Sequence, residues 1–242
     1  MITDIHANLT ALEAVLAEID EGGFEEIWCL GDVVGYGAEP DECTDLVRER
    51  CDLCLVGNHD IAVLGDLDIS SFSEAAAAAV EWTRANVSDA TLEFLRGLTP
   101  DGERAGVGLF HASPRDPVWE YVLSYEQAHA NLLAQPGTVS LVGHSHVSLF
   151  FAMPDGGGIA DTRGGQVGAG NQLDLSSGRW LVNPGSVGQP RDGDPRAAWL
   201  ALDTERLEAT YHRVEYDIEK AAAAIVAARL PERLADRLKV GQ

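Results

Sequence analysis

The chain has 242 residues, of which 45% are hydrophobic and 23% charged, and its formal net charge is −22 at pH 7. These values are ordinary for a soluble globular protein, and no apolar run approaches the roughly 20 residues that a membrane helix needs. So acidic a chain is not expected to bind nucleic acids in general or an anionic membrane. It can still bind a small anionic substrate, because bound divalent cations make a site locally positive.

Over the first 142 residues, short apolar runs alternate with helical patterns. The first helix is expected to begin at Thr10, which would form a capping box with Glu13. Further helices are predicted over 40–50, over 73–97 with a break near Ser88, and over 124–134. Strands are predicted over 27–30, 53–56, 107–110 and 139–142. This alternation is typical of a mostly parallel sheet with helices on its faces.

The pattern changes after residue 147, where turn-rich loops separate the apolar runs, and it becomes helical again from residue 218. Runs at 149–151, 180–182, 197–202 and 207–214 predict an antiparallel sheet built from hairpins. The glycines at 156–158 and 164–165 are predicted to lie in hairpin turns, since they lack the pattern of a phosphate-binding loop.

Both halves fit one α/β domain over residues 1–242, with two sheets packed face to face and helices outside. Residues 61–105 would be a helical insertion between two groups of candidate ligands, where they could shape or cover the pocket.

The four cysteines are Cys29, Cys43, Cys51 and Cys54. Cys51 and Cys54 have a spacing found in zinc and redox sites, but no second pair accompanies them and Cys54 lies in a predicted strand. With no secretory signal in the sequence, we interpret the thiols as buried and inert, and we expect a cytoplasmic protein.

Five polar clusters each follow a strand at the point where it is predicted to end. The clusters are Asp4 with His6, Asp32, Asn58 with His59 and Asp60, His111, and His144 with His146. Ligands of open α/β sheets bind outside the carboxyl ends of the strands, so these clusters should converge on one edge. The glycines before Asp32, Asn58 and His144 would let the backbone turn sharply there.

The side chains of these clusters suit a divalent metal site. Carboxylate, imidazole and amide oxygen are ligands for Mn, Fe, Co, Ni or Zn. Five of the seven histidines lie in the clusters, whereas His129 and His212 have no such neighbours and are interpreted as surface or packing residues.

In chain order, the motifs Asp4-x-His6, Gly31-Asp32, Gly57-Asn58-His59-Asp60, His111 and Gly143-His144-x-His146 resemble those of the calcineurin-like metallophosphoesterases. The segments GDVVGYG, HASPRDPVWEY and NPGSVGQPRDGDPRAAW are similar to a bacterial and archaeal branch of small predicted phosphodiesterases. The resemblance covers nearly the whole chain. It implies a four-layer αββα sandwich with the metals at the edge of the sheets.

The resemblance also implies a role for each cluster. Asp4, His6, Asp32 and His146 would hold one metal; Asp32, Asn58, His111 and His144 would hold the other. Two such ions lower the pKa of a bridging water, and the resulting hydroxide attacks the phosphoester. His59 would contact the phosphate or protonate the leaving oxygen, and Asp60 would orient His59. Only three residues precede Asp4, so either the first strand is short or the natural start lies upstream.

Four further residues are candidates for substrate contacts: Arg191, Arg115, Asn8 and Tyr36. Guanidinium matches phosphate oxygens in a fork, and Arg191 is the better candidate because it lies in the NPGSVGQPRDG segment. The alternatives are surface ion pairs for the arginines, helix capping for Asn8 and loop packing for Tyr36.

The function expected is hydrolysis of a small phosphoester, with diesters as the first candidates. A protein phosphatase and a diadenosine tetraphosphate hydrolase are alternative enzymes, since the motifs do not separate them. A non-catalytic interaction protein of the same fold is the alternative from another class. Loss of the ligands would favour it, and this sequence keeps them all.

Overall fold

The computed structural model describes residues 1–242, and its three hydrogen-bonded sets of strands combine into two mixed sheets. In the first sheet, β1 (Trp28–Cys29) pairs in parallel with β2 (Leu53–Cys54), and β10 (Ala197–Asp203), β11 (Glu208–Val214) and β8 (Gln172–Asp174) form an antiparallel set. The first residues of the chain join these two parts. Ile2 bridges to Cys29 on one side, and Met1 exchanges backbone hydrogen bonds of 2.9 and 3.0 Å with Leu200 on the other. Residues 1 and 2 therefore lie between β1 and β10 and link the two sets of strands.

The second sheet has six strands in the order β3-β4-β5-β9-β6-β7. Its strands are β3 (Asp101–Arg104), β4 (Val107–Phe110), β5 (Val139–Leu141), β6 (Leu149–Met153), β7 (Arg163–Gln166) and β9 (Arg179–Asn183). β4, β5 and β9 run parallel, and the other pairs are antiparallel. The predicted division into one mostly parallel and one antiparallel sheet was wrong. Each sheet combines strands from both halves of the chain, because β10 pairs with the N-terminal residues and β9 with β5.

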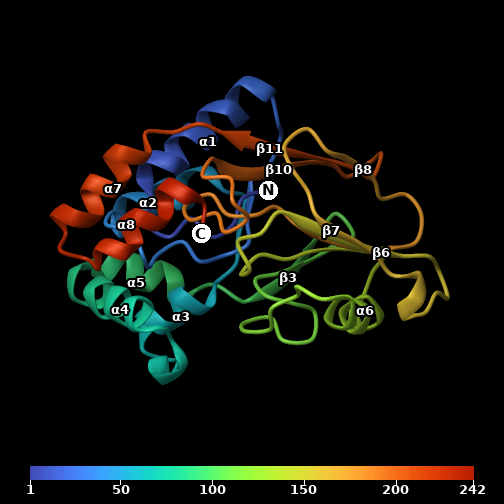
Figure 1. The fold of residues 1–242 in the computed structure, drawn as a ribbon, viewed down its shortest axis with the longest axis horizontal. Helices are drawn as coiled ribbons and strands as arrows, with labels where there is room; N and C mark the ends of the chain where they lie inside the picture. The colour runs from blue at the N-terminus through green and yellow to red at the C-terminus, as the bar shows by residue number, and fades with distance from the viewer.

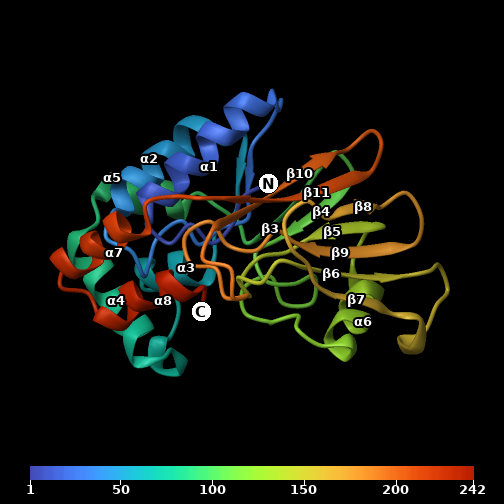
Figure 2. The ribbon, with the colours of Figure 1, turned by 45° about the horizontal axis from the view of Figure 1, so that its top comes forward.

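The two sheets pack face to face around a core of large apolar side chains. The side chains between the sheets include Trp28, Leu109, Leu141, Leu200 and Tyr211. α1 (Leu9–Gly22) packs on the outer face of the first sheet against β10 and β11, and α6 (Tyr125–Ala134) packs on the second against β6 and β9. Figures 1 and 2 show these layers, which confirm the predicted αββα sandwich.

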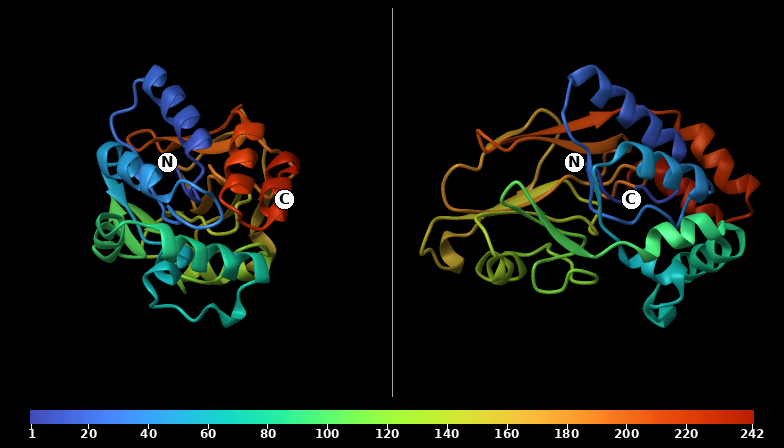
Figure 3. Two further views of the ribbon diagram at one scale, coloured as in Figure 1. Left: turned by 90° about the vertical axis from the view of Figure 1, so that its left-hand side faces the viewer. Right: turned by 180° about the vertical axis from the view of Figure 1, so that it is seen from behind.

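The remaining helices gather at one end of the sandwich, as Figures 1 and 3 show. They are α2 (Pro40–Arg50), α3 (Asn58–Leu64), α4 (Glu74–Asn86), α5 (Asp89–Arg96), α7 (Ile218–Ala227) and α8 (Glu232–Val240). Short 3-10 turns occur at η1 (Ile69–Ser71) and η2 (Ile159–Asp161). No helix combines the length and apolar character required to cross a bilayer.

Two predictions about helix starts had different outcomes. The break near Ser88 is confirmed, because α4 ends at Asn86 and the Ser88 side chain caps α5 by accepting from the Thr91 N–H. The capping box at Thr10 was wrong. α1 begins at Leu9, and its cap is Asn8, whose side-chain oxygen accepts from the Ala11 N–H at 3.1 Å.

Candidate metal centre

The predicted convergence of the polar clusters is confirmed. Asp4 and His6 follow the bridge at Ile2, Asp32 follows β1, Asn58 follows β2, His111 follows β4, and His144 and His146 follow β5. Although these strands belong to two sheets, their carboxyl ends lie together, and every one of these side chains is at most 4% exposed.

The first group of side chains comprises Asp4, His6, Asp32 and His146, whose ligand atoms lie within 4.8 Å of one another. His6 Nε2 is 3.0 Å from His146 Nε2 and 3.5 Å from Asp32 Oδ2. His146 Nε2 is 3.4 Å from Asp4 Oδ1. Two imidazole nitrogens and two carboxylates thus face one point, which is the arrangement of a divalent metal site.

The second group shares Asp32 with the first and adds His111 and His144. His111 Nε2 is 3.6 Å from Asp32 Oδ2 and 3.1 Å from Asn58 Oδ1, so the Asn58 amide oxygen completes the group. Asp32 Oδ2 and His144 Nε2 are buried and have no hydrogen-bond partner in the chain. Unpaired buried polar atoms are rare, and two of them facing one group of ligands are the mark of a site built for an ion.

Backbone carbonyls select the tautomer of three of the four candidate histidine ligands. His6 Nδ1 lies 3.2 Å from the Val34 oxygen, His111 Nδ1 2.9 Å from that of Leu30, and His146 Nδ1 2.7 Å from that of Gln189. In His144 the buried Nε2 is the nitrogen without a partner. In His6, His111 and His146, Nδ1 therefore carries the proton, and Nε2 presents a lone pair to the centre.

The charges of the centre also call for a cation. Burial raises the pKa of Asp4 to about 7 and raises that of Asp32 well above its usual value, with the nearby Asp60 charge as the second cause for Asp32. Burial lowers the pKa values of His6, His144 and His146 well below the usual range, so these rings are neutral. The carboxylates meet only histidines among their ion-pair partners. A divalent cation would supply the missing positive charge, and the donor set fits it.

The backbone is strained where it presents the ligands. Asp4, His6, Asp32, His144 and His146 all have positive φ angles between 52° and 63°. Non-glycine residues rarely adopt this left-handed conformation, and clusters of such residues are found at functional sites.

Only Gly31, with φ of 98°, provides the backbone turn predicted for the three glycines. Gly57 and Gly143 are required instead for close packing. A Cβ on Gly57 would lie 2.1 Å from Asp32 Oδ1, and one on Gly143 would lie 2.3 Å from Thr3 Oγ1. Sequence patterns do not reveal such contacts.

His59 adjoins the two groups but is not one of their ligands. Its ring packs edge-on against His6 at 4.9 Å and lies 4.3 Å from the Tyr36 ring. Its backbone N–H donates to Asp32 Oδ1 at 2.8 Å, and its buried Nδ1 has no partner in the chain. Burial, and secondly the charge of Arg191, lower the pKa of His59 well below the usual range.

Asp60 does not orient His59, which corrects the role implied by the resemblance. Its Oδ1 accepts from the Val34 N–H at 3.0 Å, and its Oδ2 accepts from the Gly57 N–H at 2.9 Å. Asp60 is the third residue of α3, so its carboxylate folds back onto the residue that precedes the helix. Through these two hydrogen bonds Asp60 links the start of α3 to the loop after β1, and it thereby positions Asn58 and Asp32.

The candidates for substrate contacts differ in position. Arg191 lies with its guanidinium 5.5 Å from the Tyr36 ring centre, and its charge lowers the pKa values of several ligand histidines. Arg115 instead pairs with Glu120 at 3.3 Å and is about half exposed. Of the two arginines, Arg191 is therefore the better candidate for hydrogen bonds from its guanidinium group to phosphate oxygens.

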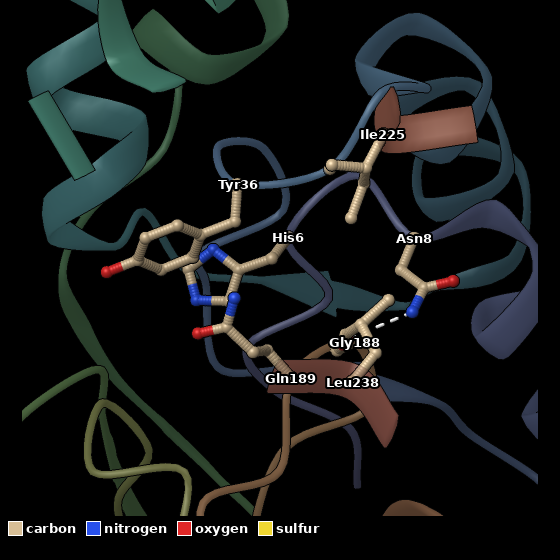
Figure 4. Close-up of a pocket in the computed structure, with 8 residues that line it drawn as sticks. His6, Asn8, Tyr36, Gly188, Gln189, Ile225 and Leu238 are labelled. Carbon is tan, nitrogen blue, oxygen red and sulfur yellow. Dashed lines mark hydrogen bonds between the residues drawn. The ribbon is translucent and has the colours of Figure 1, made fainter. Parts of the chain in front are cut away.

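Asn8 has structural contacts at both ends, as Figure 4 shows for one of them: its Nδ2 donates to the Gly188 oxygen at 2.9 Å, and its Oδ1 caps α1. Together with His6, Tyr36, Ile225 and Leu238 it lines a cavity of about 10 Å³, which is room for about one water molecule. This cavity is too small for a substrate.

Three aromatic residues at the centre were missed in the sequence. The Tyr121 ring stacks on His144 at 4.0 Å, the Trp119 ring lies 5.9 Å from His144, and Phe72 lies 5.1 Å from His59. Trp119 and Tyr121 occur in the HASPRDPVWEY segment. The resemblance of this segment to a branch of small predicted phosphodiesterases was the sequence signal that could have identified them. Phe72 comes from the segment predicted to shape or cover the pocket.

The chain is similar to known proteins along its whole length. The calcineurin-like phosphoesterase superfamily domain matches residues 1–206. An uncharacterized protein of Methanocaldococcus jannaschii is 40% identical over 247 residues, covering 100% of this chain and 97% of the relative. The crystal structure of a metallophosphoesterase from Sphaerobacter thermophilus is 40% identical with a TM-score of 0.89, over 100% of this chain and 97% of that one. A hypothetical protein from Pyrococcus horikoshii OT3 has the same fold, with a TM-score of 0.78 at 20% identity and the same coverage.

Proposed function

The chain belongs to the calcineurin-like phosphoesterase superfamily, and on that premise we propose that it is a metal-dependent hydrolase of phosphodiester bonds in a small substrate. The observation that carries the proposal is the pair of ligand groups that share Asp32. A shared carboxylate is typical of dinuclear hydrolytic centres. When bound, two divalent ions polarise a phosphoryl oxygen and lower the pKa of a water molecule.

The side chains of this protein would bind and orient the phosphate. Arg191 is the cation whose charge acts on the ligand histidines, and its guanidinium can donate two hydrogen bonds to phosphate oxygens. The His59 ring lies 4.9 Å from the His6 ring without being a metal ligand, so it can bond to the phosphate or to the leaving oxygen.

The proposal is tested by loading the protein with Mn²⁺ and comparing hydrolysis of an aryl phosphodiester with that of the matching monoester. We expect the diester to be favoured and His59→Ala to lower turnover, by roughly 10²–10⁴-fold if the ring acts as general acid, with metal content unchanged. Turnover of the monoester alone would redirect the search to phosphatase substrates. A protein that takes up no metal and hydrolyses neither ester would refute the proposal.

A further inference from the structure

The aromatic residues beside the metal centre form a surface that the proposed chemistry does not require. Trp119 and Tyr121 are 37% and 41% exposed, although their rings approach the buried ligand His144. Exposed aromatic rings at the edge of a phosphate site are suited to contact the organic part of a substrate.

The loop that carries these rings is fixed in place. Glu120 accepts from Ser113 Oγ at 2.7 Å and from Asn131 Nδ2 at 2.9 Å. Val122 is buried, and Asp116 Oδ1 accepts from the Trp119 N–H at 3.1 Å. The rings are therefore held in place before a ligand binds, which reduces the entropy lost on binding.

Each ring also has one side supported by the protein. The Tyr121 ring lies nearly parallel to His144, at an interplanar angle of 27°. The Trp119 ring lies 5.4 Å from Phe72 at 32°. A flat ligand ring could stack on the solvent side of this pair while its phosphate reached the ligands behind it. The cavity at Asn8 offers no competing space, because it holds about one water molecule.

We propose that Trp119 and Tyr121 form a stacking platform for the base of a nucleoside phosphoester whose phosphate lies at the metal centre, an inference that rests on the proposed function. Bases stack on aromatic side chains with little dependence on their identity. The platform therefore selects nucleosides as a class over alkyl phosphoesters, and it leaves the choice of base open.

The direct test is binding to the Mn²⁺-loaded protein, measured by titration calorimetry with thymidine 5′-phosphate and 2-deoxyribose 5-phosphate. We expect the nucleotide to bind more tightly, and Trp119→Ala to weaken its binding by about 5- to 150-fold, the range for loss of one stacked base. Binding of the sugar phosphate should not change. Trp119→Phe should restore most of the difference.

Tyr125→Ala is the matched control. Tyr125 is an exposed aromatic residue, 47% exposed, close in sequence, but its ring packs on Phe151 and its hydroxyl donates to the Gly164 oxygen. It should leave both affinities unchanged. Trp119→Leu provides a second truncation if the alanine variant does not fold, as checked by its melting curve.

Equal affinity of the wild type for the two ligands, or equal weakening of both by Trp119→Ala, would overturn the platform even if the protein hydrolyses phosphodiesters. A nucleotide preference that depends on Trp119 in a protein without hydrolytic activity would support the platform and refute the proposed function.

Discussion

The role of Asp60 gives a prediction that separates a positioning residue from a catalytic one. Its carboxylate accepts backbone hydrogen bonds from Val34 and Gly57 and none from His59. In Asp60→Asn, the side-chain oxygen can still accept one of these two hydrogen bonds. The amide nitrogen is a donor, so the other backbone N–H is left buried without an acceptor. The variant should therefore lose stability and loosen the loops that present Asp32 and Asn58.

The expected size follows from those contacts. Loss of one buried hydrogen bond to a charged group costs about 1.5–3 kcal/mol. For a chain of this length, each kcal/mol lowers the Tm by about 2–4 °C, so the shift would be about 3–12 °C. Removal of the Asp60 charge relieves its repulsion with Asp32 and offsets part of this loss, so the lower end is expected. Metal affinity should fall roughly 10–100-fold, as for other residues that orient ligands.

Calorimetric melting of the metal-free protein and Mn²⁺ titration measure both effects. The matched control is Asp68→Asn, since Asp68 also accepts from a helix-start N–H, that of Ser70, but on the exposed surface. It should leave the Tm and metal binding unchanged. The reasoning would be refuted if Asp60→Asn melted like the wild type and lost turnover at saturating metal, because this would restore a direct partnership with His59.

Three further changes have defined outcomes. Gly57→Ala should displace Asp32, whose Oδ1 would lie 2.1 Å from the new methyl group, and should lower stability by about 1–3 kcal/mol and reduce the amount of bound metal. Gly168→Ala, whose new methyl group would have no neighbour within 4 Å, should change neither stability nor bound metal. Metal analysis and melting curves test this, and equal behaviour of the two variants would contradict it. Arg191→Ala should lower kcat/KM for the phosphodiester by roughly 10- to 150-fold, because a charged contact to the phosphate is lost. Arg115→Ala should leave kcat/KM unchanged, since Arg115 pairs with Glu120. Steady-state kinetics test this, and a larger loss of kcat/KM in Arg115→Ala than in Arg191→Ala would assign the phosphate contact to Arg115. Leu141 lies between the sheets, so Leu141→Ala should lower the free energy of unfolding by about 2–5 kcal/mol in denaturant titrations. Leu133 is 59% exposed, so Leu133→Ala should leave this free energy nearly unchanged. Similar losses in the two variants would show that Leu141 is not part of the core.

The position of the candidate ligands could be predicted because it depends on local patterns. A polar residue after an apolar run marks the end of a strand, whichever neighbouring strand or sheet that strand joins. Asp4, Asp32, Asn58, His111 and His144 therefore converged as expected, although their strands proved to belong to two sheets. Sheet membership depends on pairing between distant segments, such as Met1 with Leu200, and no local pattern records it.

Side-chain partnerships were harder to predict for the same reason. Asp60 follows His59 in sequence, yet its carboxylate bonds to the backbone of Val34 in another loop. Asn8 caps α1 two residues before the predicted cap at Thr10, since Asn and Thr are both acceptable caps and only geometry decides between them. The left-handed conformations of Asp4 and His6 also carry no sequence signal, because neither residue is glycine.

The central claim is that Asp32 is shared by two metal sites. Anomalous diffraction from crystals of the Mn²⁺-loaded protein tests it most directly. We predict two peaks, one among Asp4, His6 and His146 and one among Asn58, His111 and His144, with Asp32 between them. A map with one peak or none from protein saturated with Mn²⁺ would contradict the shared site.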